Sequence, residues 1–127
     1  MLIDSDILIW LTRGHVGAQA VLGKIKPWRI SSVTYIELAQ GCRNQQELKQ
    51  VKQGLLAADT EIIPITANIS SRAMTLIDEY ALASGLRLAD ALIAATALET
   101  DLTLLSANTK HFKPIKHLKI KGFDPEA

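Results

Sequence analysis

The sequence is poor in residues that cross-link or stiffen a chain. Of its 127 residues one is cysteine, four are proline and 5% are aromatic. A single cysteine, Cys42, excludes an internal disulfide and favours a reducing, cytoplasmic setting. Its neighbours offer no Cys-His pairing, so a packed thiol is a better interpretation than a nucleophile. With so few aromatics, the core must be mostly aliphatic and alanine-rich.

The sequence also lacks long apolar runs and a basic leader. The first residues, MLIDSDILIWL, are apolar but include two acids, which argues against a signal peptide. No run approaches the ~18 apolar residues that a membrane span requires. No repeat, low-complexity stretch or Pro/Gly-rich linker divides the chain. With 48% hydrophobic and 21% charged residues, the sequence predicts one globular domain over residues 1–127.

Short buried strands alternate with helices along the chain. Strands are expected at 1–4, 28–31, 61–65, 102–105 and 118–120. Helices are expected at 5–14, 15–26, 45–57 and 88–99, and Pro27 closes the second of these. A further helix follows a Thr34-x-x-Glu37 capping box, and a long one is capped by Thr66 and ended by Gly85. The segment LADALIAATALE is apolar nearly all round, which indicates a buried helix. This alternation predicts an α/β fold with a mainly parallel sheet.

Four polar residues fall just beyond strand ends or near helix starts. Asp4 ends the first strand, Glu37 follows the second, Asp90 opens the most apolar helix, and Asn108 follows LTLL. In a parallel sheet these positions share one edge, and ligands bind in the crevice beyond the carboxyl ends of the strands. We therefore expect one acidic site.

Each of these acids also has a purely structural interpretation. Asp4 would cap the following helix, and Glu37 would complete its capping box. Asp90 would interact favourably with the positive end of a helix dipole. Asp6 is better interpreted as a solvated acid in a first helical turn, with a supporting role in the site as the alternative. Each signal alone is weak, and only their convergence favours a site.

Clustered carboxylates need a neutralising partner. Two of them ~5 Å apart repel by about 3 kcal/mol at an effective dielectric near 20. Oxygen ligands without His or Cys suit Mg²⁺ or Mn²⁺ better than zinc. Such ions activate water and stabilise charge that develops on a phosphate. The pattern of acids therefore predicts a metal-dependent phosphodiesterase.

Four segments resemble, in order and spacing, the signature regions of PIN-domain nucleases, and of VapC-type toxins of bacterial toxin–antitoxin pairs in particular. They are LIDSDILIW, SSVTYIEL, LRLADALIAATAL and LTLLSANTKHF, and they span essentially the whole chain. The resemblance implies a three-layer α/β/α sandwich. It also implies that Asp4, Glu37 and Asp90 coordinate one or two Mg²⁺ or Mn²⁺ ions for hydrolysis of an RNA phosphodiester.

The fourth region departs from the usual Thr-x-Asp or Thr-x-Asn pattern. It has Ser106-Ala107-Asn108 here, followed by His111 and Phe112. An amide at Asn108 adds no negative charge, so the resemblance implies a weaker second metal site. Ser106 would hydrogen-bond a water or Asp4. His111 would contact RNA, although a packing or surface histidine is commoner.

The same resemblance implies partners: structured RNA such as tRNA, an inhibitory antitoxin and a second copy in a homodimer. Four apolar residues are candidates for a partner surface or equally for the core: Trp10, Leu11, Tyr35 and Ile36. Between Asp101 and Asp124 there are five lysines and no acid. This segment is either a solvated face or a phosphate-contacting surface.

Two rival functions are weighed against the nuclease. A receiver domain would use Asp59 as phosphoacceptor and Lys113-Pro114 after its last catalytic strand, but Asp59 precedes a strand instead of ending one. A catalytically silent PIN-like module would bind RNA or protein without cleaving. The weak fourth position favours such a module, and the three main acids argue against it.

Overall fold

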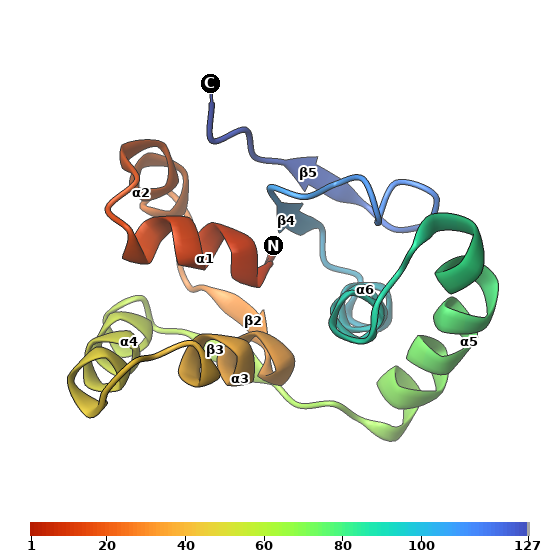
Figure 1. Ribbon diagram of the computed structural model, residues 1–127, viewed down its shortest axis with the longest axis horizontal. Helices are drawn as coiled ribbons and strands as arrows, with labels where there is room; N and C mark the ends of the chain where they lie inside the picture. The colour runs from red at the N-terminus through yellow and green to blue at the C-terminus, as the bar shows by residue number, and fades with distance from the viewer. Residues whose placement is uncertain (127) are drawn as a thin grey trace.

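A computed structural model describes residues 1–126, which form a five-stranded sheet covered by helices on both faces. Figure 1 shows α5 and α6 on one side of the sheet and α1, α2 and α4 on the other. The elements are β1 (Leu2–Ile3), α1 (Ser5–Thr12), α2 (Val16–Leu22), β2 (Arg29–Ser31), α3 (Ser32–Gln40), α4 (Gln45–Ala57), β3 (Glu61–Ile63), α5 (Ala67–Ser84), α6 (Leu88–Thr100), β4 (Leu104–Ser106) and β5 (Ile120–Gly122).

All strand pairs are parallel, in the order β3-β2-β1-β4-β5. The shortest strand, β1, lies at the centre, with Leu2 opposite Leu104 and Ile3 opposite Leu105. Because every strand runs the same way, all five carboxyl ends lie at one edge. The predicted parallel α/β/α fold is confirmed.

Alternate residues of the central strands serve two separate cores. Leu2 and Leu104 face the cluster under α5 and α6, whereas Ile3 and Leu105 face the cluster under α1, α2 and α4. All four are 0–1% exposed. This period-two alternation gives each face of the sheet its own aliphatic layer. The alanine-rich face of α6 packs closely in the first layer, as its apolar sequence predicts.

Proline and capping chemistry set several helix and strand ends. β3 ends at Ile63, before Pro64, which has no N–H to donate to the sheet ladder. The predicted helix 15–26 is shorter: α2 spans Val16–Leu22 and has Gly23 as its C-cap, so it ends before proline at 27 could act. Thr66 caps α5 through a hydrogen bond from the N–H of Ile69, as predicted. Gly85 ends α5 at φ +75°, a conformation that suits glycine.

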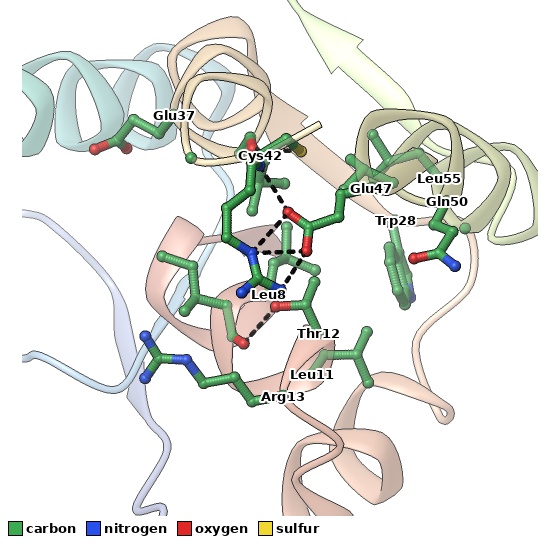
Figure 2. Close-up of a pocket in the computed structure, with 16 residues that line it drawn as sticks. Leu8, Leu11, Thr12, Arg13, Trp28, Glu37, Cys42, Glu47, Gln50 and Leu55 are labelled. Atoms are coloured by element: carbon green, nitrogen blue, oxygen red, sulfur yellow. Dashed lines mark hydrogen bonds and ion pairs between the residues drawn. The ribbon is translucent and has the colours of Figure 1, made fainter. Parts of the chain in front are cut away.

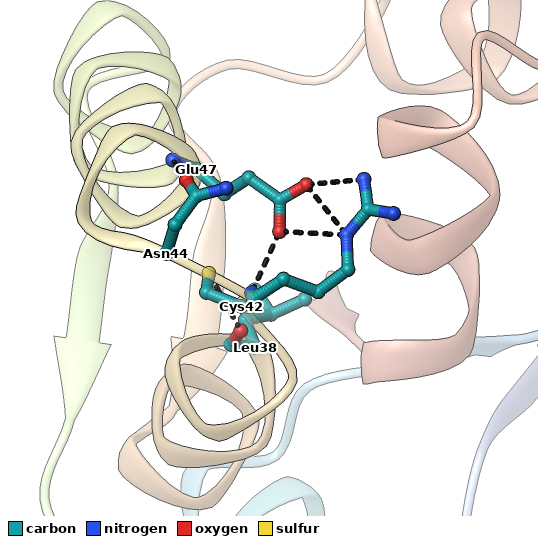
Figure 3. A network of polar contacts seen from close by, with 5 residues as sticks. Leu38, Cys42, Asn44 and Glu47 are labelled. Atoms are coloured by element: carbon teal, nitrogen blue, oxygen red, sulfur yellow. Dashed lines mark hydrogen bonds and ion pairs between the residues drawn. The ribbon is translucent and has the colours of Figure 1, made fainter.

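The predicted Thr34–Glu37 capping box is wrong. Ser31 caps α3 instead, by accepting the N–H of Val33, so Thr34 and Glu37 lie within the helix. A reciprocal cap occurs at α4: Asn44 Oδ1 accepts the N–H of Glu47, and the Glu47 carboxylate accepts the N–H of Arg43 (Figure 3). The pattern N-x-x-E at this position was the better capping signal.

The receiver alternative is also wrong. Asp59 lies in the turn between α4 and β3, exposed and at φ +53°, instead of at the carboxyl end of a central strand. No helix in the described part of the chain is long and apolar enough to cross a bilayer.

Candidate active site

The site begins at the carboxyl edge of the sheet, where β1 and β4 end side by side. Asp4 follows β1 directly, and its N–H donates to Leu105 O at 2.9 Å. Ser106 is the last residue of β4 and is fully buried. Since β1 and β4 are neighbours in register, two side chains about 100 positions apart in sequence meet at one point.

Asp4 is the most enclosed acid of this edge, with only 5% of its surface exposed. Its Oδ1 accepts the N–H of Ser5 at 2.8 Å, which caps α1, and its Oδ2 accepts the hydroxyl of Ser106 at 2.8 Å. The capping interpretation of Asp4 is therefore confirmed, and the cap leaves Oδ2 directed at Ser106. The expected hydrogen bond between Ser106 and Asp4 is confirmed.

Asp6 binds the loop that follows β4. Its Oδ1 accepts the N–H of Ala107 at 3.3 Å, and its Oδ2 accepts the N–H of Asn108 at 2.9 Å. The hydroxyl of Ser106 lies 3.3 Å from the same Oδ2. The expectation of a solvated acid is therefore wrong: the turn into α1 aims Asp6 at β4, a contact that no local pattern in the sequence reveals.

Asn108 contributes to this network through its backbone. Its N–H is shared between Asp6 Oδ2 and Ser106 Oγ, the latter at 3.0 Å, while the residue itself is exposed. The hydroxyl of Ser106 has a single proton, and Asp4 Oδ2 at 2.8 Å is a closer acceptor for it than Asp6 Oδ2 at 3.3 Å. Asp6, Asn108, Ser106 and Asp4 thus form one ordered chain of hydrogen bonds.

Glu37 reaches the site through Ser5, a residue that the sequence analysis missed. The hydroxyl of Ser5, in the first turn of α1, donates to Glu37 Oε1 on α3 at 2.9 Å. Ser5 is only 8% exposed. A serine inside the otherwise apolar run LIDSDILIW was the available signal, because a buried hydroxyl needs a partner.

Asp90 lies in the first turn of α6 and is half-buried. Repulsion from its charge is the smallest of the causes that raise the pKa of Asp4. No side chain caps α6, whose N-cap residue is Arg87. A favourable interaction with the dipole of α6 would by itself explain an acid at this position. The functional interpretation of Asp90 therefore depends on the buried Asp4.

Burial dominates the electrostatics of the edge. Loss of solvent, followed by repulsion from Asp6, raises the pKa of Asp4 to about 7, against the opposing hydrogen bonds from Ser106 and Ser5. Burial likewise raises the pKa of Asp6, although the N–H groups of Ala107 and Asn108 oppose the change. Within residues 1–126 no basic side chain forms an ion pair with Asp4, Asp6, Glu37 or Asp90.

The donor set fits a hard divalent cation. The carboxylates of Asp4, Glu37 and Asp90 supply oxygen only, and the buried charge of Asp4 lacks a protein counter-ion. In the described part of the chain, however, no three His, Cys, Asp or Glu side chains are close enough to hold an ion as they stand. Binding would therefore require the half-buried side chains of Glu37 and Asp90 to turn toward Asp4.

A groove of about 770 Å³ lies beside this edge, between α1, the end of α3 and α4. Its lining is largely apolar and includes Trp28 and Leu55, together with the Arg43–Glu47 ion pair (Figure 2). Figure 2 shows Glu37 at one end, its carboxylate directed away from Glu47. The groove therefore opens next to one of the candidate site residues.

Other candidate residues have structural environments. Cys42 is half-buried, and its thiol donates to Leu38 O at 3.3 Å. His111 Nδ1 lies 3.0 Å from Ser84 O, at the end of α5, which is the packing role that is commoner for histidine. Of the four apolar candidates for a partner surface, Trp10, Leu11 and Tyr35 pack against the core, and Ile36 is 56% exposed.

Comparison with known proteins assigns this arrangement to a class. Residues 1–118 match the PIN domain, and the chain belongs to the PIN-domain family. It is 36% identical to Ribonuclease VapC10 of Mycobacterium tuberculosis, over 100% of this chain and 99% of that protein. A toxin-antitoxin complex from Klebsiella pneumoniae contains a chain with 31% identity and a TM-score of 0.80, over 97% of this chain and 98% of that one. A chain in the structure of VapBC2 from Rickettsia felis, bound to a DNA fragment from its promoter, has 26% identity and a TM-score of 0.77, over 97% of this chain and 98% of that one.

Proposed function

We propose that this protein is a metal-dependent endoribonuclease and the toxin of a toxin–antitoxin pair. The observation that carries the proposal is the buried Asp4, held between Ser5 and Ser106 at the carboxyl edge of the sheet without a protein counter-ion in residues 1–126. A buried, uncompensated carboxylate is costly to the fold, and a cation-dependent function explains its presence. Whole-length similarity to a named ribonuclease supports the same reaction.

In this proposal Asp4, Glu37 and Asp90 hold Mg²⁺ or Mn²⁺, and Asn108 borders the site. The bound ion would supply activated water and stabilise the charge that develops on a scissile phosphate. Ser106 fixes the orientation of the Asp4 carboxylate by donating to Oδ2, and Ser5 fixes that of Glu37 by donating to Oε1. Asp6 supports the loop of Ala107 and Asn108, which follows Ser106.

Cleavage of a total tRNA pool with Mg²⁺ or Mn²⁺ tests the reaction. Discrete fragments are expected from the wild type and are expected to disappear in Asp4→Asn and Asp90→Asn. Asp59→Asn is the matched control, because that acid is exposed, lies away from the carboxyl edge, and has a φ of +53° that asparagine tolerates. Metal binding without cleavage of any RNA would instead favour a PIN-like module that binds RNA or protein without cleaving, the alternative that the amide of Asn108 suggests.

The partners are proposed on the same footing: RNA as substrate, a cognate antitoxin and a second copy of the chain. Solved relatives occur in toxin-antitoxin complexes. An antitoxin is expected to abolish cleavage when it is added to the purified protein in equal amounts. Light scattering tests the homodimer, and a single species of 13.9 kDa would contradict it.

A further inference from the structure

The segment after the site loop is a lysine strap, defined here as residues 110–121. Every third residue is buried or half-buried: Phe112 and Ile115 are 1% and 4% exposed, and Leu118 packs on the same core cluster. The five lysines of the strap fall between these anchors and are all exposed: Lys110, Lys113, Lys116, Lys119 and Lys121. The strap therefore has an apolar inner side and a cationic outer side.

The strap is held in place along its length. His111 Nδ1 lies 3.0 Å from Ser84 O, and the N–H of Lys116 donates to the hydroxyl of Tyr80 at 3.3 Å, both on α5. The strap then enters β5, which pairs with β4 along the edge of the sheet. These contacts fix the backbone of the strap, so less entropy is lost when its lysines bind a ligand.

The strap begins two residues beyond Asn108, whose N–H is bound to Asp6. It leaves the carboxyl edge there, crosses to the opposite edge, and returns in β5, so Gly122 lies opposite Ser106 (Figure 1). The strap thus runs from the loop beside the acidic site to the outer strand of the sheet and has exposed lysines along its length.

Charge is segregated along this chain in a way that its net charge of +1 conceals. Residues 102–123 hold five of the 14 basic residues and none of the 13 acidic ones. Only Lys119 among the strap lysines forms an ion pair within residues 1–126, with Asp101 at 2.9 Å. The remaining four lysines are available to a polyanion.

We propose that the lysine strap binds the phosphate backbone of the RNA substrate. Asp4, Asp6, Glu37 and Asp90 repel a phosphate at the site itself, so affinity for RNA has to come from an adjoining surface. Lysine contacts to phosphate are independent of sequence, and they hold a strand without selecting the bond that is cut. The inference rests on the proposed function, because RNA is taken as the substrate.

Binding of a fluorescently labelled tRNA pool, measured in EDTA so that no metal-dependent cleavage occurs, tests the strap. The variant replaces Lys110, Lys113 and Lys116 by Gln. Its matched control replaces Lys24, Lys49 and Lys52, which are equally exposed lysines elsewhere on the molecule. The strap variant is expected to bind about tenfold more weakly at about 0.1 M salt, with a salt dependence of log Kd shallower by about two units. The control is expected to change neither value by more than about twofold.

Replacement of the same three strap lysines by Arg keeps the charge and is expected to restore binding. Equal losses in the strap variant and its control would overturn the proposal, and so would unchanged RNA binding. Unchanged RNA binding with lost binding of poly-L-glutamate would assign the strap to an acidic protein partner instead. Cleavage by the wild type is measured separately. If RNA binding depends on the strap but no RNA is cleaved, only the proposed nuclease activity is refuted. If RNA is cleaved but binding does not depend on the strap, only the proposed role of the strap is refuted.

Discussion

Asp4 gives the metal-free protein an unusual dependence on pH. Its pKa is about 7 in the folded chain and near 3.8 in the unfolded one, so between these values only the folded chain keeps the proton. The free energy of unfolding therefore falls as pH rises through this window and levels off above it. We expect the melting temperature in EDTA to be lower at about pH 8 than at about pH 5.

Asp4→Asn provides the comparison for that experiment. It cannot ionise, so its melting temperature should vary with pH much less than that of the wild type. An equally steep decrease in this variant would show that another group is responsible, and a rise with pH in the wild type would contradict the sign.

Asp6 offers a second prediction at the scale of one side chain. Asp6→Ala leaves the N–H of Ala107 without its acceptor and leaves that of Asn108 with Ser106 Oγ alone, at a cost of about 1–3 kcal/mol. Asp6→Asn keeps one acceptor oxygen and removes the repulsion on Asp4, so its melting temperature should exceed that of Asp6→Ala. Cleavage should follow the same order, Asn above Ala. Equal loss of cleavage in two stable variants would show that the charge of Asp6, and not its hydrogen bonds, is required.

The residues of the candidate site were only partly predictable. Asp4 and Ser106 could be predicted because each follows a short apolar run, and the carboxyl ends of parallel strands lie at one edge of the sheet. The contacts of Ser5 and Asp6 could not be predicted, because they depend on the direction in which α1 leaves β1. That direction brings Ser5 to α3 and Asp6 to the β4 loop, and it is a tertiary property.

At the scale of elements, α3 provides a test of helix capping. Ser31 is its cap, so Ser31→Ala should lower the free energy of unfolding by about 1 kcal/mol. Thr34 is fully buried, and its hydroxyl has no hydrogen-bond partner in the described residues. Thr34→Val should therefore raise stability, by about 1 kcal/mol. Denaturant unfolding measures both, and destabilisation by Thr34→Val would show that the hydroxyl of Thr34 is hydrogen-bonded in solution.

Element types were easier to predict than element ends. The order of strands and helices follows from apolar periodicity, which burial enforces. The strand predicted at 118–120 lies at Ile120–Gly122, because its register is set by pairing with β4 and not by its own side chains. Local sequence does not encode that partner, so the boundary shifted while the strand itself was confirmed.

For the molecule as a whole, metal binding and folding should be linked. A cation that binds only the folded protein stabilises it by about 2.7 kcal/mol at a hundred times its Kd. Mg²⁺ or Mn²⁺ should therefore raise the melting temperature of the wild type. Asp90→Asn should melt higher than the wild type in EDTA, because it relieves repulsion on Asp4, and should gain little from metal.

The opposite result is equally informative. If Asp90→Asn melts lower in EDTA and still gains the full stabilisation from metal, Asp90 is a structural acid at the start of α6. Asp78→Asn, at an exposed position on α5, controls for a general loss of negative charge.

The central place of β1 has a consequence for biosynthesis. Residues 2–4 complete their ladder only with residues 103–105, and Asp4 meets its serine partner only at Ser106. A ribosome must therefore translate past the end of β4, and release that stretch from its exit tunnel, before the acidic edge can assemble. A nascent chain that extends past Asp90 but not past β4 carries all the acids of the site and still lacks the arrangement that brings Asp4 to Ser106, so we expect the proposed activity only after β4 has been synthesised.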